Sequence, residues 1–559
     1  MKAIEWQIKW IVKDYVLEGW LNLKQVLLNI RDQCVPLLTN KLNKCKWVTR
    51  KVIKCRRSKY KAWQKFCKIK TAEAREIYKK KRNMSLKVNR LAQKDYELKL
   101  AANIKKDSKS FFSYVNNKKK LGTKIGPLKD LNNNLVTDDL EMSNIINIYF
   151  SSVFTNDSDN LPNLAPLLDD NESLSSINIS EQLVLKKLKE LKTNKSPGPD
   201  DLHPKLLFEL SKIISKPLAK LYTLSLNSGL IPNDWKLAHV TPLFKKGSKS
   251  ECKNYRPVSL TSILCKILES IIKDSINEHL IKYSLIKNSQ HGFRTGKSCL
   301  SNLLDFYNIV TAWLDKSNCV DIVYLDFAKA FDKVSHLGLM IKLQSLGITG
   351  STYKWIKMWL SDRKQCVVIN GHCSEWKDVS SGVPQGSVLG PILFTIFIND
   401  IDNSVKSKLS KFADDTKLGK VVNNESQARE FQSDLDKLYY WSKQWKMEFN
   451  LEKCVCMHVG YKNKNFNYHI GETVLKSVES EKDLGIIIDK NFKFTEQCAN
   501  AVKKANQMLG IIKRKIKYKS KDVIVKLYKT LVRPHLEYCI QFWSPSFVCE
   551  KRSIESVQR

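Results

Sequence analysis

Apolar and polar positions alternate most clearly in one short stretch near the middle of the chain. Over residues 319–327 the alternation has a period of two, which predicts a strand and places Ile322, Tyr324 and Asp326 on one face. A carboxylate at the end of an otherwise apolar strand is costly unless it has a partner, and a divalent cation is one such partner. The pattern therefore predicts a strand that ends in a functional acidic group.

A second pattern consists of two adjacent aspartates, Asp414 and Asp415, between short apolar flanks. Such flanks are typical of a β-hairpin, with the polar pair at its tip. Neighbouring carboxylates repel one another, so the pair favours a nearby cation. Taken alone, each segment is better explained as an ordinary solvated turn. Taken together, three carboxylates on neighbouring strands can hold two Mg²⁺ ions about 3.5–4 Å apart.

Helical periodicity dominates the flanking regions. We expect Thr137 to cap one helix and a second helix to start near Ser180. The predicted apolar faces are Leu140, Ile145, Tyr149 and Val153 in the first helix, and Val184, Leu188 and Leu191 in the second. Residues 391–398 predict a buried helix. Strand-like and helical runs mix irregularly over residues 198–489, which favours an α+β layout over a doubly wound parallel sheet.

The charge balance favours a polyanion as partner. Lys and Arg total 95 against 56 Asp and Glu, a formal net charge of +39. Cations crowd within residues 1–120, a region that is helical in pattern, and aromatic side chains are interleaved with them: Trp47, Tyr60, Trp63 and Phe66. These rings suit base stacking on a nucleic-acid strand, and they equally suit the apolar face of a solvated helix.

Two classes of protein are disfavoured. No apolar run approaches the length of a membrane span, and Met1–Trp6 has no continuous apolar core of a secretory signal. The 15 cysteines form no CxxC pair, so we expect neither a disulfide framework nor a zinc site. We expect most of them to be buried thiols in a reducing compartment.

Seven short motifs follow one another in a fixed order. They are residues 195–200 (KSPGPD), 254–260 (NYRPVSL), 290–294 (QHGFR), 325–332 (LDFAKAFD), 382–387 (GVPQGS), 412–415 (FADD) and 483–485 (DLG). From about residue 108 onward this set resembles the reverse transcriptase of non-LTR (LINE-type) retrotransposons, close to the jockey and chicken-repeat elements. The resemblance implies a right-hand polymerase that copies an RNA template from a DNA primer, using deoxynucleoside triphosphates.

The resemblance also implies a domain order. A basic helical region, with possible RNA binding, covers 1–120, and a linker with one helix covers 121–178. Fingers cover 179–317, the palm 318–489, and a thumb 490–559. By comparison with complete family members we expect no endonuclease domain in this sequence, and a thumb that is cut short at Arg559. An intracellular location, in nucleus and cytoplasm, fits a basic chain of this class.

The matched motifs assign roles to individual residues. Asp326, Asp414 and Asp415 match the metal ligands, which in the family hold two Mg²⁺ (or Mn²⁺) ions, and Asp415 is the less direct ligand. Lys453 matches a palm lysine that protonates pyrophosphate. Asp332, six residues beyond Asp326, is interpreted as structural.

Other matches concern the nucleotide and the primer. Phe331 corresponds to the bulky side chain that excludes a 2′-hydroxyl, and the alternative is a core aromatic. Gln385 and Gly386 correspond to the loop that touches template and incoming base. Lys245, Lys246, Arg256 and Arg294 correspond to cations that meet the triphosphate. Leu484 and Gly485 correspond to the primer grip. Trp441 and Trp445 are predicted to lie in the core.

Three hypotheses stay open at this point. The first is an active reverse transcriptase, and the second is a catalytically silent remnant that only binds RNA. The third is an RNA-dependent RNA polymerase, which Phe331 disfavours because such an enzyme must admit the 2′-hydroxyl. A phosphate-binding P-loop at residues 292–298 is rejected, because only three residues separate its glycines and the motif needs four.

Overall fold

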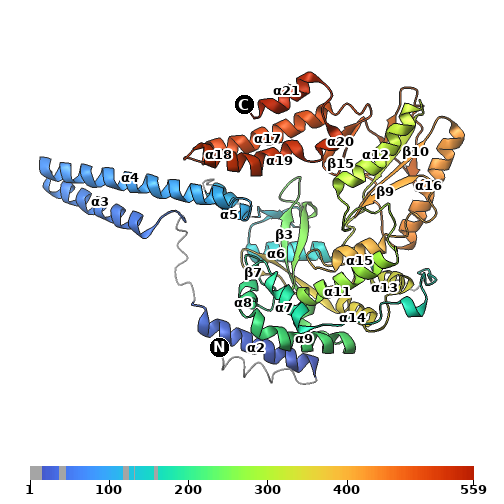
Figure 1. Ribbon diagram of the computed structural model, residues 1–559, viewed down its shortest axis with the longest axis horizontal. Coiled ribbons are helices and arrows are strands. Elements are labelled where there is room, and N and C mark those ends of the chain that lie inside the picture. The colour runs from blue at the N-terminus through green and yellow to red at the C-terminus, as the bar shows by residue number, and fades with distance from the viewer. Residues whose placement is uncertain (1–14, 37–45, 118–124, 131, 157–160, 559) are drawn as a thin grey trace. The chain divides into compact units, whose positions relative to one another are not determined.

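The computed structural model describes residues 15–36, 46–117, 125–130, 132–156 and 161–558 (Figure 1). The first residues, where we expect no secretory signal, and Arg559 lie outside this set. The chain forms two compact units. The first comprises residues 1–36 and 124–484, and the second comprises residues 37–123 and 485–559. The basic region predicted over 1–120 is therefore shared between the two units.

The central sheet of the first unit has the strand order β14-β11-β5-β10-β9. Its middle strand, β5 (Val320–Leu325), is buried along its whole length and pairs antiparallel with both neighbours. The other strands are β9 (Lys408–Phe412), β10 (Asp415–Val421), β11 (Val455–Val459) and β14 (Lys476–Ser477). The predicted strand at 319–327 is confirmed, and so is the hairpin at Asp414–Asp415.

A second sheet has the order β4-β3-β6-β7, with β8 also paired to β6. Its strands are β3 (Leu237–Phe244), β4 (Tyr255–Leu260), β6 (Arg363–Ile369), β7 (His372–Cys373) and β8 (Lys377–Val379). Helix α6 (Asp139–Ser151) packs on one face of it, where a separate apolar cluster includes Ile146, Val240 and Val367.

The sequence predicted helix α6 with two errors. Its N-cap is Asp138, which accepts a hydrogen bond from the Glu141 backbone, and not Thr137. The predicted face is also turned from the real one, since Leu140 is 47% exposed. The buried positions are four residues apart, namely Met142, Ile146 and Phe150. The second sheet selects this face, and the helix periodicity alone did not reveal it.

Helices surround both sheets of the first unit. They are α2 (Val16–Cys34), α7 (Glu181–Lys189), α8 (Pro204–Glu209), α9 (Ser211–Ser228), α10 (Asn233–Lys236), α11 (Ile263–Lys282), α12 (Cys299–Asp315), α13 (His336–Ser345), α14 (Gly350–Leu360), α15 (Gly390–Phe397) and α16 (Glu425–Gln444). The unit also contains short strands and single helical turns. The strands are β1 (Leu128–Lys129), β2 (Leu135–Val136), β12 (His469–Ile470), β13 (Thr473–Val474) and β15 (Ser480–Asp483), and the turns are η1 (Asp170–Glu172) and η2 (Cys252–Asn254). One large apolar core joins most of these helices to the central sheet.

Several helix predictions are confirmed. Ser180 caps α7, whose Val184 and Leu188 are fully buried. Helix α15 fills the predicted buried position at 391–398 almost residue for residue, because nearly every side chain in it is apolar. Trp441 and Trp445 lie in the core, as predicted. The mixture of sheets and helices confirms the α+β layout.

The second unit is built almost entirely from helices. They are α3 (Arg50–Ile69), α4 (Ala72–Asn103), α5 (Ser108–Asn117), α17 (Thr495–Lys515), α18 (Lys521–Leu527), η3 (Tyr528–Val532), α19 (Arg533–Glu537), α20 (Ile540–Trp543) and α21 (Val548–Ser556), with the strand β16 (Ile486–Asp489). The predictions of helix near both ends of the chain are thereby confirmed for the described residues. Glu97 of α4 is buried and accepts hydrogen bonds from the backbones of Lys517 and Tyr518, which joins the two chain segments.

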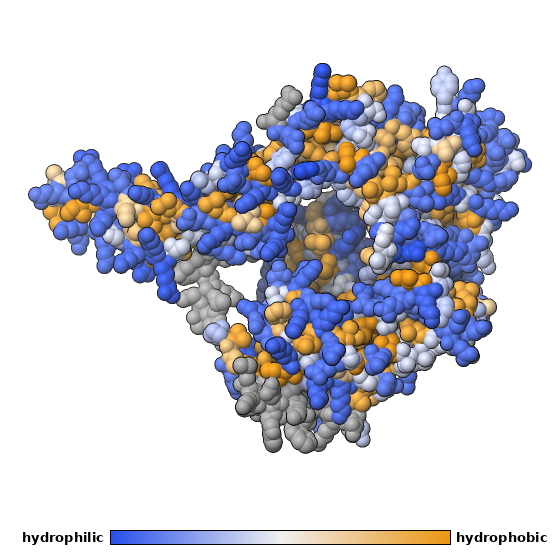
Figure 2. All heavy atoms as spheres, in the orientation of Figure 1, coloured by the Kyte–Doolittle hydropathy of each residue, from blue (hydrophilic) through white to orange (hydrophobic). Residues whose placement is uncertain are grey.

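The paired helices α3 and α4 leave part of their apolar surface in solvent. In Figure 2 this arm is mostly hydrophilic, with apolar side chains appearing as separate patches. Trp63, Phe66 and Tyr78 form an aromatic cluster, and Trp63 is still 42% exposed. Some of the interleaved rings thus pack against one another while remaining partly accessible.

Two exclusions from the sequence can be compared with the structure. Among the described helices, none combines the length and the apolar character that crossing a membrane requires. Of the fourteen described cysteines, all reduced, seven are buried, so the prediction that most are buried thiols is only half met. Exposed thiols occur on helices as well as on the edge strand β7, because a surface position imposes no packing requirement.

A buried polar network lies at the far end of the central sheet from the aspartate hairpin. Asp321 on β5 is fully buried and is bonded by His458 Nδ1 at 2.7 Å, Tyr468 Oη at 2.5 Å and Asn463 Nδ2 at 2.8 Å. A carboxylate this deeply buried is tolerated only when neighbouring groups donate hydrogen bonds to it. The network therefore joins β5 and β11 to the loop that carries Tyr468.

We expect Asp321→Ala to lower the free energy of unfolding by about 3 kcal/mol, because the buried His458 and Tyr468 and the half-buried Asn463 lose their common partner. Denaturant unfolding followed by circular dichroism measures the change. The matched control is Asp315→Ala at the exposed end of α12, which should stay within about 0.5 kcal/mol of the wild type. Equal effects of the two substitutions would contradict a structural role for the network.

Candidate active site

The register of the central sheet brings the predicted aspartates together. Thr416 of β10 pairs with Leu325 of β5, so the next step of the same antiparallel register sets Asp415 opposite Asp326. Asp414 lies in the turn between β9 and β10. The three carboxylates that the sequence placed on separate segments thus meet at one end of the sheet.

The hairpin turn has an unusual backbone. Ala413 has φ 55°, a left-handed conformation that a residue with a side chain seldom adopts. Its backbone N–H donates to Gln290 Oε1 at 3.0 Å, and the same oxygen accepts from the Gly292 backbone at 2.7 Å. A Cβ on Gly292 would lie 2.3 Å from the Ala413 nitrogen, so only glycine fits there. The QHGFR motif therefore holds the aspartate turn in place.

Burial and mutual repulsion act on both aspartates of the turn. Desolvation, with Asp414, Asp483 and Asp326 nearby, raises the pKa of Asp415 to about 6. Desolvation also raises the pKa of Asp414, and the charge of Asp326 adds to the effect. Carboxylates that repel one another in this way gain most from a bound cation.

The Asp326 carboxylate forms an ion pair with the ammonium group of Lys453. The backbone oxygen of Asp326 accepts a hydrogen bond from Asn450 at 2.7 Å, which fixes the segment that carries Lys453 to the end of β5. The predicted palm lysine is thus placed beside a predicted metal ligand. A cation bound by Asp326 has to share or replace this amine.

These groups line a cavity of about 170 Å³. Asp326, Asp415 and Asp483 on its wall offer oxygen ligands, the kind that Mg²⁺ and Mn²⁺ prefer. The repulsion among the carboxylates and the oxygen-only donor set fit a divalent metal ion. Glu481 also lines the cavity, and Asp414 adds a further carboxylate close to the same place.

A second ion pair links the cavity to the predicted primer grip. Lys417, two residues after Asp415 on β10, is buried and forms an ion pair with Asp483. Tyr307 Oη donates to the same carboxylate at 3.0 Å. Leu484 follows with φ 45° and also lines the cavity. Asp483 thus anchors the DLG segment to strand β10, which begins at Asp415, while Gly485 opens the second unit.

Three predicted finger cations lie at one end of the second sheet. Lys245 follows β3, and Arg256 on β4 is the register partner of Leu243. Burial lowers the pKa of Lys245, assisted by the charges of Arg256 and Lys453 and opposed by Asp326. Lys246 is exposed beside it. Lys245 and Arg256 are close enough to the aspartates for their charges to interact, which suits a triphosphate site.

Arg294 has a different environment from the other predicted cations. Its guanidinium group donates to the backbone oxygens of Lys287 at 2.8 Å and Gln290 at 3.3 Å. Burial lowers the pKa of Arg294. The contacts hold the loop that supports the aspartate turn, and phosphate contact by Arg294 stays a prediction.

Phe331 has its ring fixed by two others. It stacks on Phe394 of α15 with centroids 4.5 Å apart, and the Phe293 ring meets it edge-on at 6.4 Å. The ring is half-buried, so one side remains accessible. A ring held on one side and open on the other is suited to a steric gate and also takes part in the core.

The predicted template loop is tied to its surroundings on both sides. Gln385 Nε2 donates to Asp332 Oδ1 at 3.0 Å, and the backbone oxygen of Gln385 accepts a hydrogen bond from the Ser259 backbone N–H at 2.8 Å. Burial raises the pKa of Asp332 to about 6. Gly386 has φ 132°, and a Cβ there would lie 2.4 Å from the Ser259 oxygen. Asp332 thus has the structural position predicted for it, because it orients Gln385.

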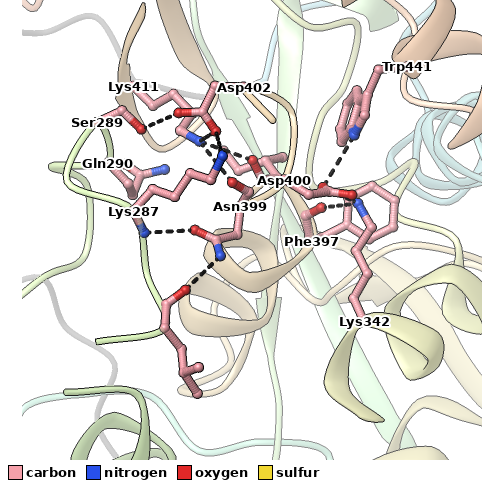
Figure 3. Close-up of polar contacts among 12 residues, drawn as sticks. Lys287, Ser289, Gln290, Lys342, Phe397, Asn399, Asp400, Asp402, Lys411 and Trp441 are labelled. Carbon is pink, nitrogen blue, oxygen red and sulfur yellow. Dashed lines mark hydrogen bonds and ion pairs between the residues drawn. The ribbon is translucent and has the colours of Figure 1, made fainter. Parts of the chain in front are cut away.

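A second layer of charges lies behind the aspartate hairpin (Figure 3). Lys411 of β9 is completely buried and reaches Asp402 at 3.2 Å, and Lys287 reaches the same oxygen at 3.1 Å. Ser289 donates to the other oxygen at 2.6 Å. Burial by itself raises the pKa of Asp402, but these partners outweigh it and hold the pKa below its usual value.

A parallel arrangement surrounds Lys342 in the same view. Its amine donates to Asp400 Oδ1 at 2.6 Å and to the Phe397 backbone oxygen at 2.5 Å, and it lies 3.7 Å from the centre of the Trp445 ring. Trp441 Nε1 also donates to Asp400 at 3.2 Å. The loop after α15 is thereby fixed by two buried lysines.

Sequence reasoning missed the supporting residues of the site. Gln290 and Gly292 were noticed only as part of a motif, and Lys411, Lys417 and Asp402 were not noticed at all. A lysine in a strand, such as Lys411 in β9 or Lys417 in β10, is normally expected to be exposed to solvent because it is charged. The only feature of the sequence that argued for burial was the apolar character of the flanking residues.

The comparisons with known proteins agree with the geometry. Residues 244–509 match the family described as "Reverse transcriptase (RNA-dependent DNA polymerase)". The "Probable RNA-directed DNA polymerase from transposon BS" of Drosophila melanogaster is 30% identical over 64% of this chain and 41% of that protein. The "RNA-directed DNA polymerase from mobile element jockey" of the same species is 27% identical over 66% of this chain and 42% of that protein.

A structural similarity was also found. The "Structure of apo telomerase from Candida Tropicalis truncated from C-terminal domain" overlaps 51% of this chain and 66% of that chain, with TM-score 0.34 and 13% identity. A TM-score this low supports no inference.

The chain therefore contains a reverse transcriptase domain over residues 244–509. Its relatives are the polymerases of non-LTR transposons of the jockey, BS and X-element type, which confirms the resemblance seen in the motifs. The chain spans about two fifths of the length of the curated relatives it matches. Reverse transcriptases generally use divalent metal ions and bind a nucleic-acid template and primer.

Burial lowers the pKa of Lys411 to about 8, with Asp402 opposing the shift. The unfolded chain, with a lysine pKa of 10.5, then binds more protons than the folded chain between about pH 8 and 10.5. The contribution of Lys411 to the free energy of unfolding is therefore lowest below pH 8 and rises between about pH 8 and 10.5. Relative to Lys411→Met, we expect the wild type to gain about 1 kcal/mol of unfolding free energy per pH unit there.

Denaturant unfolding at several values of pH between 7.5 and 10 measures this difference. The control is Lys406→Met at an exposed position in the same segment, for which the difference from the wild type should not change with pH. A constant difference between the wild type and Lys411→Met over the same range would refute the inferred shift.

Proposed function

We propose that this chain is an RNA-directed DNA polymerase of a non-LTR retrotransposon, which extends a DNA primer on an RNA template by two-metal nucleotidyl transfer. The observation that carries the proposal is the facing register of Asp326 and Asp415, with Asp414 in the adjoining turn. The family match and the transposon relatives support it.

Each part of the site has a step to perform. Two Mg²⁺ ions bound by Asp326, Asp414 and Asp415 would supply Lewis-acid activation of the primer 3′-hydroxyl and stabilise the leaving pyrophosphate. Lys245, Lys246 and Arg256 neutralise the triphosphate from the side of the second sheet.

Lys453 has two possible partners during the reaction. Its amine pairs with Asp326, and if that carboxylate held a metal ion, the amine of Lys453 would be available to a phosphate oxygen. From there it can deliver a proton to the departing pyrophosphate. Mn²⁺ fits the same oxygen ligands.

The remaining proposed features concern partners and location. The high positive charge favours RNA and an RNA–DNA hybrid as ligands, through release of counterions. The helices α3 and α4, with their cations and partly exposed rings, are a proposed RNA-contacting region. A location in nucleus and cytoplasm is part of the same proposal.

We expect the wild type to extend oligo(dT) on poly(rA) with dTTP and Mg²⁺, and Asp414→Ala/Asp415→Ala to lose more than about 99% of this activity, because the metal ligands are removed. Chelation should abolish extension, and added Mg²⁺ should restore it. Asp315→Ala is the matched control and should retain full activity.

Binding of the labelled hybrid separates chemistry from folding. The double variant should still bind the hybrid, since the phosphate-contacting cations are intact. If the folded wild type binds the hybrid but never extends it, the alternative of a silent RNA-binding remnant is the better account.

We expect Phe331→Ala to weaken discrimination against ribonucleotides by roughly 10- to 200-fold, because a small side chain leaves room for the 2′-hydroxyl. The ratio of kcat/KM for dTTP to that for UTP on poly(rA) measures it. Tyr440→Ala, an exposed aromatic position on α16, is the control and should leave the ratio unchanged. A wild type that uses UTP as well as dTTP would favour the RNA polymerase alternative.

A further inference from the structure

Three potential metal ligands from three strands lie on one face of the second sheet. His239 of β3 is the register partner of Cys366 of β6. Cys373 of β7 is the partner of Val368, which lies two residues after Cys366 and therefore on the same face. The opposite face of these strands packs against α6, as described above for the apolar cluster. Pairing of the strands thus gathers residues that no spacing motif in the sequence connects.

We propose that His239, Cys366 and Cys373 form a binding site for Zn²⁺. One imidazole nitrogen and the two sulfurs all lie within 4.8 Å of one another. In a tetrahedral site with Zn–S of about 2.3 Å and Zn–N of about 2.0–2.1 Å, neighbouring ligand atoms are about 3.3–3.8 Å apart. The ligand atoms therefore need to approach by at most about 1–1.5 Å, which small side-chain rotations provide.

The imidazole of His239 is oriented but has no protein partner among the described residues. It is half-buried, and neither ring nitrogen takes part in a hydrogen bond within the part of the chain that the structure describes. The ring stacks on Trp376, with centroids 5.9 Å apart and planes 29° apart.

The two cysteines can supply two negatively charged sulfur ligands to a divalent ion. Cys366 is 1% exposed and lies beside Cys373. Zn²⁺ binding releases one proton from each thiol, and the two thiolates then balance the charge of the ion. Cys373 is exposed, so an ion can enter from solvent and a water molecule can complete the tetrahedron.

The ligand chemistry separates this site from the aspartate cluster. Sulfur and imidazole nitrogen select Zn²⁺, whereas carboxylates select Mg²⁺ and Mn²⁺. A bound Zn²⁺ would tie the edge strand β7 to β3, at whose end Lys245 and Lys246 lie. The zinc site is independent of the proposed polymerase activity, because it uses none of the residues assigned to the reaction.

Cobalt binding to the full chain tests the proposal directly. The reduced, metal-free protein is titrated with Co²⁺, whose thiolate complexes absorb in the near ultraviolet by charge transfer. We expect one equivalent of Co²⁺ with this band, displaced by one equivalent of Zn²⁺. Carboxylate-bound Co²⁺ has no such band, so the aspartate cluster cannot produce the signal.

Variants identify the ligands. Cys373→Ser and His239→Gln should each weaken Zn²⁺ binding by at least about tenfold. Cys549→Ser, another exposed cysteine, is the matched control and should behave as the wild type. Circular dichroism of each variant establishes that it is folded.

Two results would overturn the site. One is an unchanged cobalt band and zinc stoichiometry in both folded variants. The other is a reduced wild type that shows no band, with a Cys366–Cys373 disulfide in protein purified without reductant. In that second case the cysteines form a redox pair.

Discussion

The antiparallel register of β5 and β10 brings two carboxylates to facing positions, where they repel each other. The surrounding residues compensate for this repulsion. Asp326 and Asp415 face each other because Thr416 is paired with Leu325. Two carboxylates at facing positions in a partly desolvated site destabilise one another unless cations are near. Lysines therefore recur beside the carboxylates, each from a different element, and the proposed polymerase chemistry would use the same electrostatic demand to recruit metal ions.

Behind the reacting groups, rigidity comes from charge pairs that are themselves buried. Lys411 with Asp402 and Lys342 with Asp400 fix the loop after α15 against the strand that leads to the aspartate turn. A buried pair gains little net stability, because desolvation offsets attraction, but breaking it is costly. Such pairs specify one arrangement of the backbone, and a site that binds two metal ions needs its ligands held within a fraction of an ångström.

The sequence predicted what depends on local pattern and missed what depends on long-range packing. Strand β5 and the aspartate hairpin follow from alternation over a few residues, and α15 follows from an unbroken apolar run. The cap and buried face of α6 were mispredicted, because the second sheet decides which side is covered. The Lys417–Asp483 pair joins residues 66 positions apart, and the His239, Cys366 and Cys373 group requires strand pairing that no spacing reveals. The matched motifs, and not physical pattern, supplied the roles of the site residues.

The hydrogen bond from Ala413 to Gln290 has a consequence for the order of folding. It closes a loop of 123 residues, and both the side-chain oxygen and the glycine contact must be in place before the left-handed turn is stabilised. Loop closure of this length has a large entropic cost that only later contacts recover. On the ribosome, the segment around Gln290 emerges long before its partner has been synthesised. We therefore expect the hairpin that carries the aspartates to be completed late, after the helices and strands between them have formed.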